Sequence, residues 1–335
     1  MKEKIKEYLK NKGLDVEKPI FKYLENGIEI SEKDEYMHNW GEFPEHHNES
    51  WYFNFIDRKS DVFFITRISF VMGQNKSQIM MILIIDKKIN TYLKEIPLEE
   101  MPDNLEFDKK IKYYCIKPFD EWRITFEDRK HKLNINLKGR FPVHNSAEGE
   151  DPIEMIEEYG LEILDIAGQQ HYEQPMIATG TLIEKKKDAK RNINALGHRD
   201  HSWGTRDWVN IDGWNWVDAQ FPDMTINFFR SRVFGKTLEY GTIFEENNKT
   251  LIKGVEVSTV TEEDGKTPRV STFTLTDENG KERSVVSRTI KSLHFPVPGV
   301  TKKGGFTEIY EQISVFEYDD KEGDGISEHM ISTRK

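Results

Sequence analysis

The chain has 335 residues, of which 36% are hydrophobic and 32% are charged, and its formal net charge is −11. This length predicts about two domains, and the 12% of aromatic residues can build a folded core. The acidic balance, with no basic block, excludes a nucleic-acid partner, because binding phosphates needs a positive surface.

Three further features narrow the class of protein. The longest apolar run, residues 79–85, is too short to cross a bilayer, so no integral membrane segment is expected. The opening MKEKIKEYLKNKG lacks the apolar centre of a signal peptide. Cys115 is the only cysteine, which excludes an intramolecular disulfide and a cysteine-based zinc site. We therefore expect a cytoplasmic protein.

The first half of the chain predicts one short helix followed by strands. Residues 2–12 place Ile5, Tyr8 and Leu9 on one helical face, and Gly13 ends the helix. After about residue 50, apolar residues recur at every second position, which is typical of strands. The strands expected here are residues 51–57, 62–71, 78–86, 121–127 and 132–138, with turns at 73–76 and 128–131.

A loop with a helical stretch after Asp151 is expected over residues 145–160, where proline, glycine and acidic residues gather. From about residue 170 the strand pattern returns. The strands expected here are residues 176–184, 215–221, 224–234, 238–245, 252–260, 271–277, 284–290 and 307–319, with an Asn-Gly turn inside 278–281.

The order of these elements predicts an all-β protein. Long helical periods and strand–helix alternation are missing from the sequence, and many short strands at regular spacing indicate sandwiches or barrels. The similar strand numbers on both sides of the break predict two barrels in series. We expect an N-terminal extension at 1–35, one barrel at 36–175 and a second at 176–335.

The densest group of reactive side chains is GHRDHSWGTRDW, residues 197–208. His198, Asp200 and His201 could hold a metal, but Arg199 and Arg206 would oppose the cation, so no metal is predicted. The arginines and aspartates could equally form a buried paired network, and the tryptophans could be core. A third interpretation is catalysis, because a carboxylic acid surrounded by tryptophan has a raised pKa and tryptophan faces stabilise cations.

This stretch, with the earlier HYEQPMIATGTLI and ESWYF, resembles the carotenoid hydratase (hydroxyneurosporene synthase)-like superfamily from about residue 45 to the C-terminus. The resemblance implies two lipocalin-like antiparallel β-barrels in tandem. It also implies chemistry on isoprenoid double bonds or, in more distant relatives, pericyclic reactions and cyclisations. The family's His-x-Trp pair corresponds to His201 and Trp203, and a carboxylate deeper in the barrel completes the proposed chemistry.

The candidate site follows from the stretch and the resemblance together. The catalytic candidates are His201 and three carboxylates, Asp200, Asp207 and Asp218. The candidates for binding the substrate are Trp51, Glu173, Arg199, Trp203, Arg206, Trp208, Trp214, Trp216 and Glu308.

The spacing within residues 198–203 makes a geometric prediction. If this segment is extended, Arg199, His201 and Trp203 share one side and His198, Asp200 and Ser202 take the other. We expect His201 and Trp203 to face a ligand cavity where the two barrels meet. Arg199 would pair with Asp207, Glu173 or Glu308. Asp200 would pair with Arg206.

Two functions fit these expectations. The first is a cofactor-independent acid–base enzyme, a hydratase, dehydratase, isomerase or cyclase, acting on a small apolar isoprenoid- or polyketide-like compound. The second is a non-catalytic lipocalin-like carrier or sensor of a lipid-like ligand, in which the charged stretch is structural. The fold alone does not choose between them.

Overall fold

The computed structural model describes residues 2–14, 30–38, 43, 47–98, 102–161, 169–205, 210–246, 248–297 and 306–333. Strands dominate them, and all strand pairs are antiparallel. Within these residues, no helix is long and apolar enough to cross a membrane. The expectation of an all-β protein is confirmed.

The chain divides into two compact units, which are described separately. The first unit comprises Met1–Glu158 with Gly168–Arg206, and the second comprises Tyr159–Ala167 with Asp207–Lys335. The expected boundary between residues 175 and 176 falls inside a strand of the first unit. That strand, β9 (Gln169–Glu184), pairs with neighbours on both sides in the first sheet, so residues assigned to the second barrel belong to the first unit.

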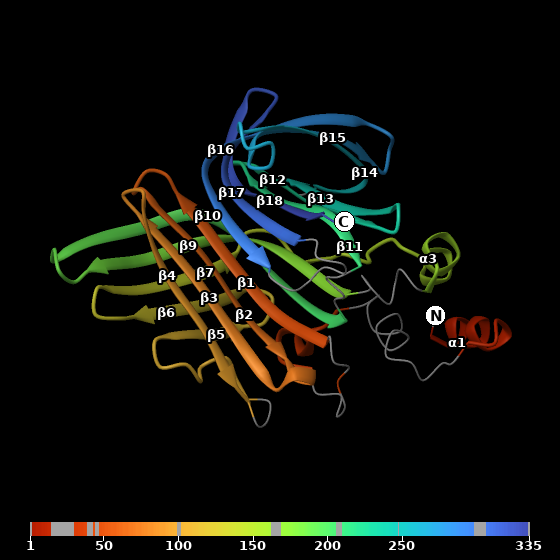
Figure 1. The fold of residues 1–335 in the computed structure, drawn as a ribbon, viewed down its shortest axis with the longest axis horizontal. Coiled ribbons are helices and arrows are strands. Elements are labelled where there is room, and N and C mark those ends of the chain that lie inside the picture. Colours follow the sequence, from red (N-terminus) through yellow and green to blue (C-terminus); the bar gives the residue numbers. More distant parts are fainter. Residues whose placement is uncertain are drawn as a thin grey trace. The chain divides into compact units, whose positions relative to one another are not determined.

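One ten-stranded sheet forms the body of the first unit, and Figure 1 shows its strands β1 to β4 side by side. Its strand order is β4-β3-β2-β1-β10-β9-β7-β6-β5, with β8 paired to β9. The other strands are β1 (His47–Asp57), β2 (Val62–Val71), β3 (Lys76–Ile85), β4 (Lys88–Pro97), β5 (Ile111–Lys117), β6 (Glu121–Glu127), β7 (His131–Gly139), β8 (His144–Asn145) and β10 (Ala189–Thr205).

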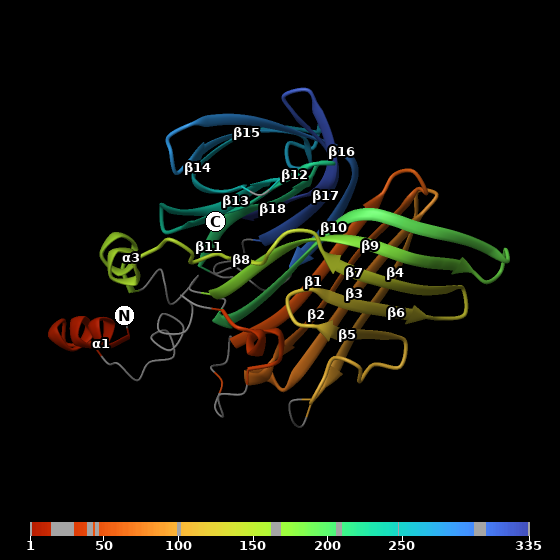
Figure 2. The same ribbon diagram turned by 180° about the vertical axis from the view of Figure 1, so that it is seen from behind.

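The first sheet curls so that its two ends approach each other, as Figures 1 and 2 show from opposite sides. The ring of Tyr92 on β4 lies 5.8 Å from that of Phe126 on β6. The hydroxyl groups of Thr66 on β2 and Tyr113 on β5 are 2.5 Å apart. The alternate apolar residues of these strands thereby share one buried interior, which includes Trp51, Phe53, Phe64, Trp122 and Ile135.

Short helical elements complete the first unit. They are α1 (Lys2–Asn11), η1 (Glu32–Glu35), η2 (Met72–Gln74) and most of α3 (Pro152–Tyr159). The helices expected at the N-terminus and after Asp151 correspond to α1 and α3. Strands β4, β5, β8 and most of β10 were not among those expected, and neither was Lys321–Thr333 in the second unit. Most of β4 is exposed, because it is an edge strand, and this weakens its apolar alternation.

A closed barrel of eight strands forms the second unit, in the order β11 to β18. Its strands are β11 (Ile211–Gln220), β12 (Met224–Val233), β13 (Lys236–Glu245), β14 (Asn248–Thr261), β15 (Pro268–Asp277), β16 (Glu282–Val297), β17 (Phe306–Tyr318) and β18 (Lys321–Thr333). Apolar residues such as Val217, Phe228 and Phe316 fill its core. The protein therefore has two barrel-like domains, one curled and open, the other closed.

We expect Gly325→Ala to destabilise the closed barrel. A Cβ at Gly325 would overlap the carbonyl oxygen of Asp218 on the adjoining strand, so the backbone must shift. Overpacking of this kind costs about 1–3 kcal/mol. Urea unfolding followed by circular dichroism should show the loss. Gly254→Ala is the matched control, because a Cβ there meets Thr276 at an ordinary 3.4 Å; equal effects of both changes would contradict the prediction.

Candidate active site

The 197–208 stretch begins in strand β10, and it has the alternation that its spacing predicts. In the register of the sheet, His201 lies between Trp51 on β1 and Tyr172 on β9. Arg199, His201 and Trp203 face the interior of the curled sheet, where Arg199 contacts the ring of the core residue Trp122. Asp200 lies on the opposite face, close to His171.

Arg199 forms a buried ion pair with Glu35 of η1. Nη2 lies 2.6 Å from Oε1 and Nη1 lies 2.9 Å from Oε2, and both side chains are 0% exposed. Arg199 Nε also donates to Gln174, and its guanidinium lies 5.2 Å from the ring of Tyr172. The guanidinium group of Arg199 therefore binds to groups of the protein itself: Glu35, Gln174 and the ring of Tyr172.

The carboxylates expected to pair with Arg199 have other partners. Glu173 contacts His198 at 2.6 Å and His171 at 3.1 Å. Glu308 belongs to the second unit, where it contacts Lys266 and His294. The prediction of Glu173 or Glu308 as the partner was therefore wrong. The sequence pattern around residues 197–208 carries no information about η1, which lies 164 residues away.

Glu35 is also the point at which η1 is fastened to the sheet. Its side chain accepts hydrogen bonds from Tyr172 Oη (2.8 Å) and from the backbone N–H of Phe119 (2.6 Å). Its carbonyl oxygen accepts one from the indole of Trp51 (3.2 Å). We call this set of contacts, together with Arg199, the Glu35 anchor. It fixes the positions of Asp34 and of the residues that follow η1.

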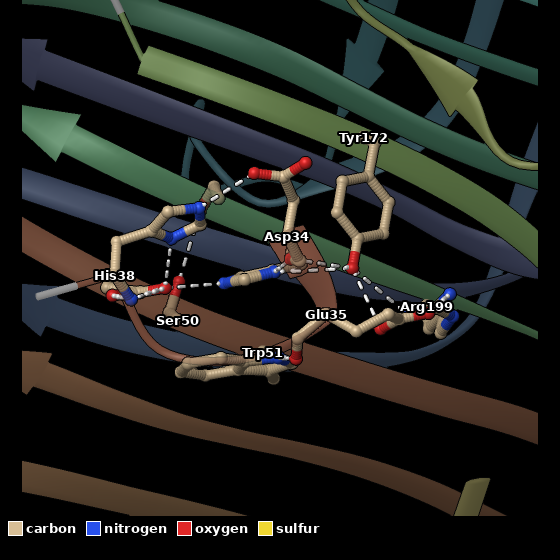
Figure 3. Close-up of polar contacts among 10 residues, drawn as sticks. Asp34, Glu35, His38, Ser50, Trp51, Tyr172 and Arg199 are labelled. Carbon is tan, nitrogen blue, oxygen red and sulfur yellow. Dashed lines mark hydrogen bonds and ion pairs between the residues drawn. The ribbon is translucent and has the colours of Figure 1, made fainter. Parts of the chain in front are cut away.

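Next to the anchor, Asp34, His38, Glu49 and His201 form a group of two carboxylates and two imidazoles that are joined by hydrogen bonds. Figure 3 shows Asp34 and His38 of this group beside Glu35 and Arg199 of the anchor. His38 contacts Asp34 Oδ1 through Nε2 (3.0 Å) and Glu49 Oε1 through Nδ1 (2.8 Å). His201 contacts the same Glu49 oxygen through Nε2 (2.9 Å) and the Asp34 carbonyl oxygen through Nδ1 (2.8 Å). We call these four residues the imidazole–carboxylate group.

The hydrogen-bond partners determine where the protons lie. Burial alone would lower the pKa of His38, but its hydrogen bonds to Asp34 and Glu49 raise that pKa to about 9. Burial would likewise raise the pKa of Glu49, but hydrogen bonds from His201 and His38 lower it. Glu49 is therefore ionised, and His38 carries a positive charge at neutral pH.

His201 differs from His38 because it has no access to solvent. Burial lowers the pKa of His201 below its usual value, although Glu49 partly opposes that shift. Its Nδ1 lies at hydrogen-bond distance from the Asp34 carbonyl oxygen, and its Nε2 from Glu49 Oε1. The positive charge of His38 lies between Asp34 and Glu49, and Arg199 balances Glu35. Burying such charges is tolerable only when they are paired.

Two tryptophans pack on the two imidazoles. The ring of His201 stacks on Trp51 at 4.1 Å, and the ring of His38 stacks on Trp203 at 4.3 Å. The expected aromatic surroundings are thus present, but they surround imidazoles and not a carboxylic acid. Stacked aromatic faces also favour a positive charge on these rings.

The four residues of this group differ in their exposure to solvent. The side chains of His201 and Glu49 are 0% and 1% exposed, whereas those of His38 and Asp34 are 14% and 23% exposed. The half-buried hydrophobic residues that pack against the interior of the same unit include Met37, Met72, Ile96, Leu98 and Phe107. We call these five residues the apolar rim. One of them, Met37, directly precedes His38 in the chain.

Two sets of side chains lie close enough together to hold a metal ion. One is His38, Glu49 and His201, and the other is His171, Glu173 and Asp200 on the opposite face, each with its donor atoms within 4.8 Å of one another. In the first set the contacts are hydrogen bonds that carry protons. In the second, burial would raise the pKa of Glu173, but His171 and His198 lower it. The absence of a metal stays a prediction.

The structure brings together four of the predicted site residues: Trp51, Arg199, His201 and Trp203. Glu173 and Asp200 take the opposite face of the sheet. The second unit contains Glu308 and three residues of β11, namely Trp214, which donates to Glu328, Trp216, and Asp218, which accepts from Gln220 at 2.6 Å. Arg206, Asp207 and Trp208 lie outside the described residues, so the expected Asp200–Arg206 pair stays a prediction.

Sequence reasoning missed five residues of this site: Asp34, Glu35, His38, Glu49 and Tyr172. Three of them had a usable signal. Glu49 begins the ESWYF segment and Tyr172 lies in HYEQP, both quoted for the resemblance, and Asp34 is the third. The pair Ser31 and Asp34 has the spacing of a helix start, and both the N–H and the hydroxyl of Ser31 donate to Asp34. His38 had no such signal.

Comparisons with known proteins agree with this fold. A family model described as "Domain of unknown function (DUF7064)" matches residues 31–333, and the chain belongs to this family. No curated protein matches the chain significantly.

Three crystal structures share the architecture at low sequence identity. A Nitrosomonas europaea protein described as an AttH has a TM-score of 0.66 at 13% identity, covering 92% of this chain and 98% of that chain. CghA has 0.62 at 9%, covering 88% and 91%. Kievitone hydratase from Nectria haematococca has 0.56 at 9%, covering 92% and 97%. These likenesses establish the fold and agree with the tandem architecture that the resemblance implied.

We expect Glu35→Ala to destabilise the first unit strongly. The change leaves Arg199 buried without its carboxylate, which costs about 3–5 kcal/mol. Urea unfolding of both proteins measures the difference. Glu32→Ala removes an exposed carboxylate from the same short helix and should stay within about 0.5 kcal/mol. A loss no larger than that of the control would mean that the Glu35 anchor does not hold the unit together.

We also expect the charge on His38 to make stability depend on pH. Its pKa is about 9 in the folded protein against 6.5 unfolded, so its contribution is complete below pH 6.5 and is lost as the pH rises through 9. The loss corresponds to about 3 kcal/mol. Urea unfolding of wild type and His38→Gln between pH 6 and 10 should show this decline in wild type only. Parallel pH profiles would contradict the prediction.

Proposed function

We propose that this member of the DUF7064 family is a cofactor-independent acid–base enzyme of the hydratase or dehydratase type. Its substrate is a small apolar compound with a carbon–carbon double bond, of isoprenoid or polyketide character. The observation that carries the proposal is His38, an imidazolium with a pKa of about 9 that is partly exposed beside an apolar rim. The group is charged at neutral pH and reachable by a substrate.

The reaction follows from the position of that proton. In the hydration direction, substrate displaces the contact between His38 Nε2 and Asp34, and Nε2–H gives its proton to one alkene carbon. The other alkene carbon becomes a cation, and the oxygen of a water molecule bonds to it. Neutral His38 then takes the extra proton from that oxygen, which leaves the alcohol and restores the imidazolium. Dehydration is the same sequence in reverse.

The neighbouring residues have supporting roles in this scheme. Glu49 holds His38 Nδ1–H throughout, and His201, itself buried, fixes Glu49 from the other side. His201 is thus a positioning residue, and His38 replaces it as the acid. The ring of Trp203 stacks on His38 at 4.3 Å and favours a positive charge on that imidazole. An apolar surrounding delays the capture of that cation by stray water.

The comparisons support the reaction class by analogy only. One protein with this fold is by name a hydratase, and the resemblance of residues 197–208 points to chemistry on double bonds. Isomerisation and cyclisation begin with the same proton transfer and differ only in the fate of the cation. His38 is therefore the acid in each of these reactions, and the fate of the cation determines the product.

A non-catalytic carrier is the second candidate, and one observation favours it. His201, Glu49, Arg199 and Glu35 are all completely or almost completely buried and fully paired, as residues of a structural network would be. In a carrier, His38 is the end of that network and transfers no proton. The two functions therefore differ in what happens when His38 is replaced.

The test is a search for proton transfer with labelled solvent. The protein is incubated with a panel of monoterpene and sesquiterpene alkenes and their tertiary alcohols in deuterated, 18O-labelled water, and products are analysed by mass spectrometry. We expect isotope incorporation, with kcat/KM lowered at least about 100-fold in His38→Gln. Activity should be constant at pH values well below 9. It should decline as the pH rises through 9, because the charged form of His38 is the acid.

The matched control is His294→Gln, which replaces an exposed histidine of the second unit and should leave turnover unchanged. Ligand binding without any isotope exchange, in wild type and in His38→Gln alike, would identify the protein as a carrier.

A further inference from the structure

A buried hydroxyl in the first unit has no hydrogen-bond partner. Ser77 lies on β3, is 0% exposed, and none of the residues that the structure describes bonds to its Oγ. A hydroxyl removed from water without a partner costs free energy, and folded proteins rarely leave one unpaired. Ser77 Oγ can therefore form a hydrogen bond with a group that the described residues do not supply.

The register of the sheet places Ser77 on the same side as the imidazole–carboxylate group. Across neighbouring strands, Trp203 pairs with Glu49, Glu49 with Phe70, Phe70 with Ser77, and Ser77 with Ile96. Directly paired residues of an antiparallel sheet point to the same face. Since β1 and β3 are separated by one strand, Glu49 and Ser77 are roughly 10 Å apart.

The residues between these two positions are apolar. Phe70 separates them in the register, and the ring of Phe70 packs on Phe107 of the apolar rim at 5.7 Å. Ile96, also of the rim, flanks Ser77 on the other side. A molecule that reaches from His38 to Ser77 must therefore be apolar over most of its length. A lone hydroxyl among such residues suits a neutral partner, because it carries no charge to balance an ion.

We infer that Ser77 binds a neutral oxygen, a hydroxyl or a carbonyl, at the far end of the substrate. The inference rests on the proposed function and names the substrate class more closely: an apolar chain with a double bond at one end and one neutral oxygen function at the other. His38 acts on the double bond. Ser77 fixes which end of the molecule reaches His38.

The experiment uses two probes of one carbon skeleton, geraniol and the hydrocarbon 2,6-dimethyl-2,6-octadiene. Binding is measured by quenching of tryptophan fluorescence, and stability by the Tm. We expect Ser77→Ala to weaken geraniol binding about three- to tenfold, the value of one hydrogen bond, and to leave the hydrocarbon unaffected. The Tm should stay the same or rise, because the change removes an unpaired buried hydroxyl.

Ser69→Ala is the matched control. Ser69 is equally buried, but it lies on the opposite face and accepts a hydrogen bond from Arg67 at 2.9 Å. Its loss should lower the Tm and leave both affinities unchanged. Three results would overturn the inference: no binding of either probe by wild type, equal weakening of both probes in Ser77→Ala, or a lower Tm with unchanged geraniol affinity.

The binding result for Ser77→Ala can be distinguished from the test of the proposed catalytic function. Discrimination between the probes at Ser77 is a binding measurement and does not need turnover. If His38→Gln shows that no proton is transferred while Ser77→Ala still weakens geraniol alone, the proposed chemistry fails and the recognition of an oxygen function stands.

Discussion

The ion pair between Arg199 and Glu35 is the interaction on which the candidate site depends. It joins η1 to the centre of the ten-stranded sheet and so helps to position Asp34 and the residues that follow η1. Asp34 contributes twice from this position, with its carbonyl oxygen to His201 and its carboxylate to His38. The Arg199–Glu35 ion pair and the imidazole–carboxylate group therefore both depend on the same short segment, η1.

Charge balance explains why so many ionisable groups can be buried together. Arg199 neutralises Glu35, and the His38 imidazolium lies between the carboxylates of Asp34 and Glu49. Removing the His38 proton would leave these two carboxylates without a cation between them. The network therefore resists deprotonation of His38, whose pKa is raised to about 9.

The sequence was informative where structure is local. Alternation within residues 198–203 correctly assigned Arg199, His201 and Trp203 to one face, and the strand periods correctly indicated two barrel-like domains. It failed where contacts join distant segments. The partner of Arg199 comes from η1, and His38 follows that element in a stretch without periodicity. The domain boundary was misplaced for the same reason, because only pairing with β1 and β7 shows where β9 and β10 belong.

The distance along the chain between Glu35 and Arg199 also bears on how the protein is made. During synthesis, Glu35 leaves the ribosome 164 residues before the cation that neutralises it. At roughly 5–20 residues per second, the nascent chain waits on the order of ten seconds or more with η1 unable to dock. Strands β1 to β7 can emerge in that interval, but the Glu35 anchor cannot assemble. The imidazole–carboxylate group is therefore complete only when nearly all of the first unit has emerged.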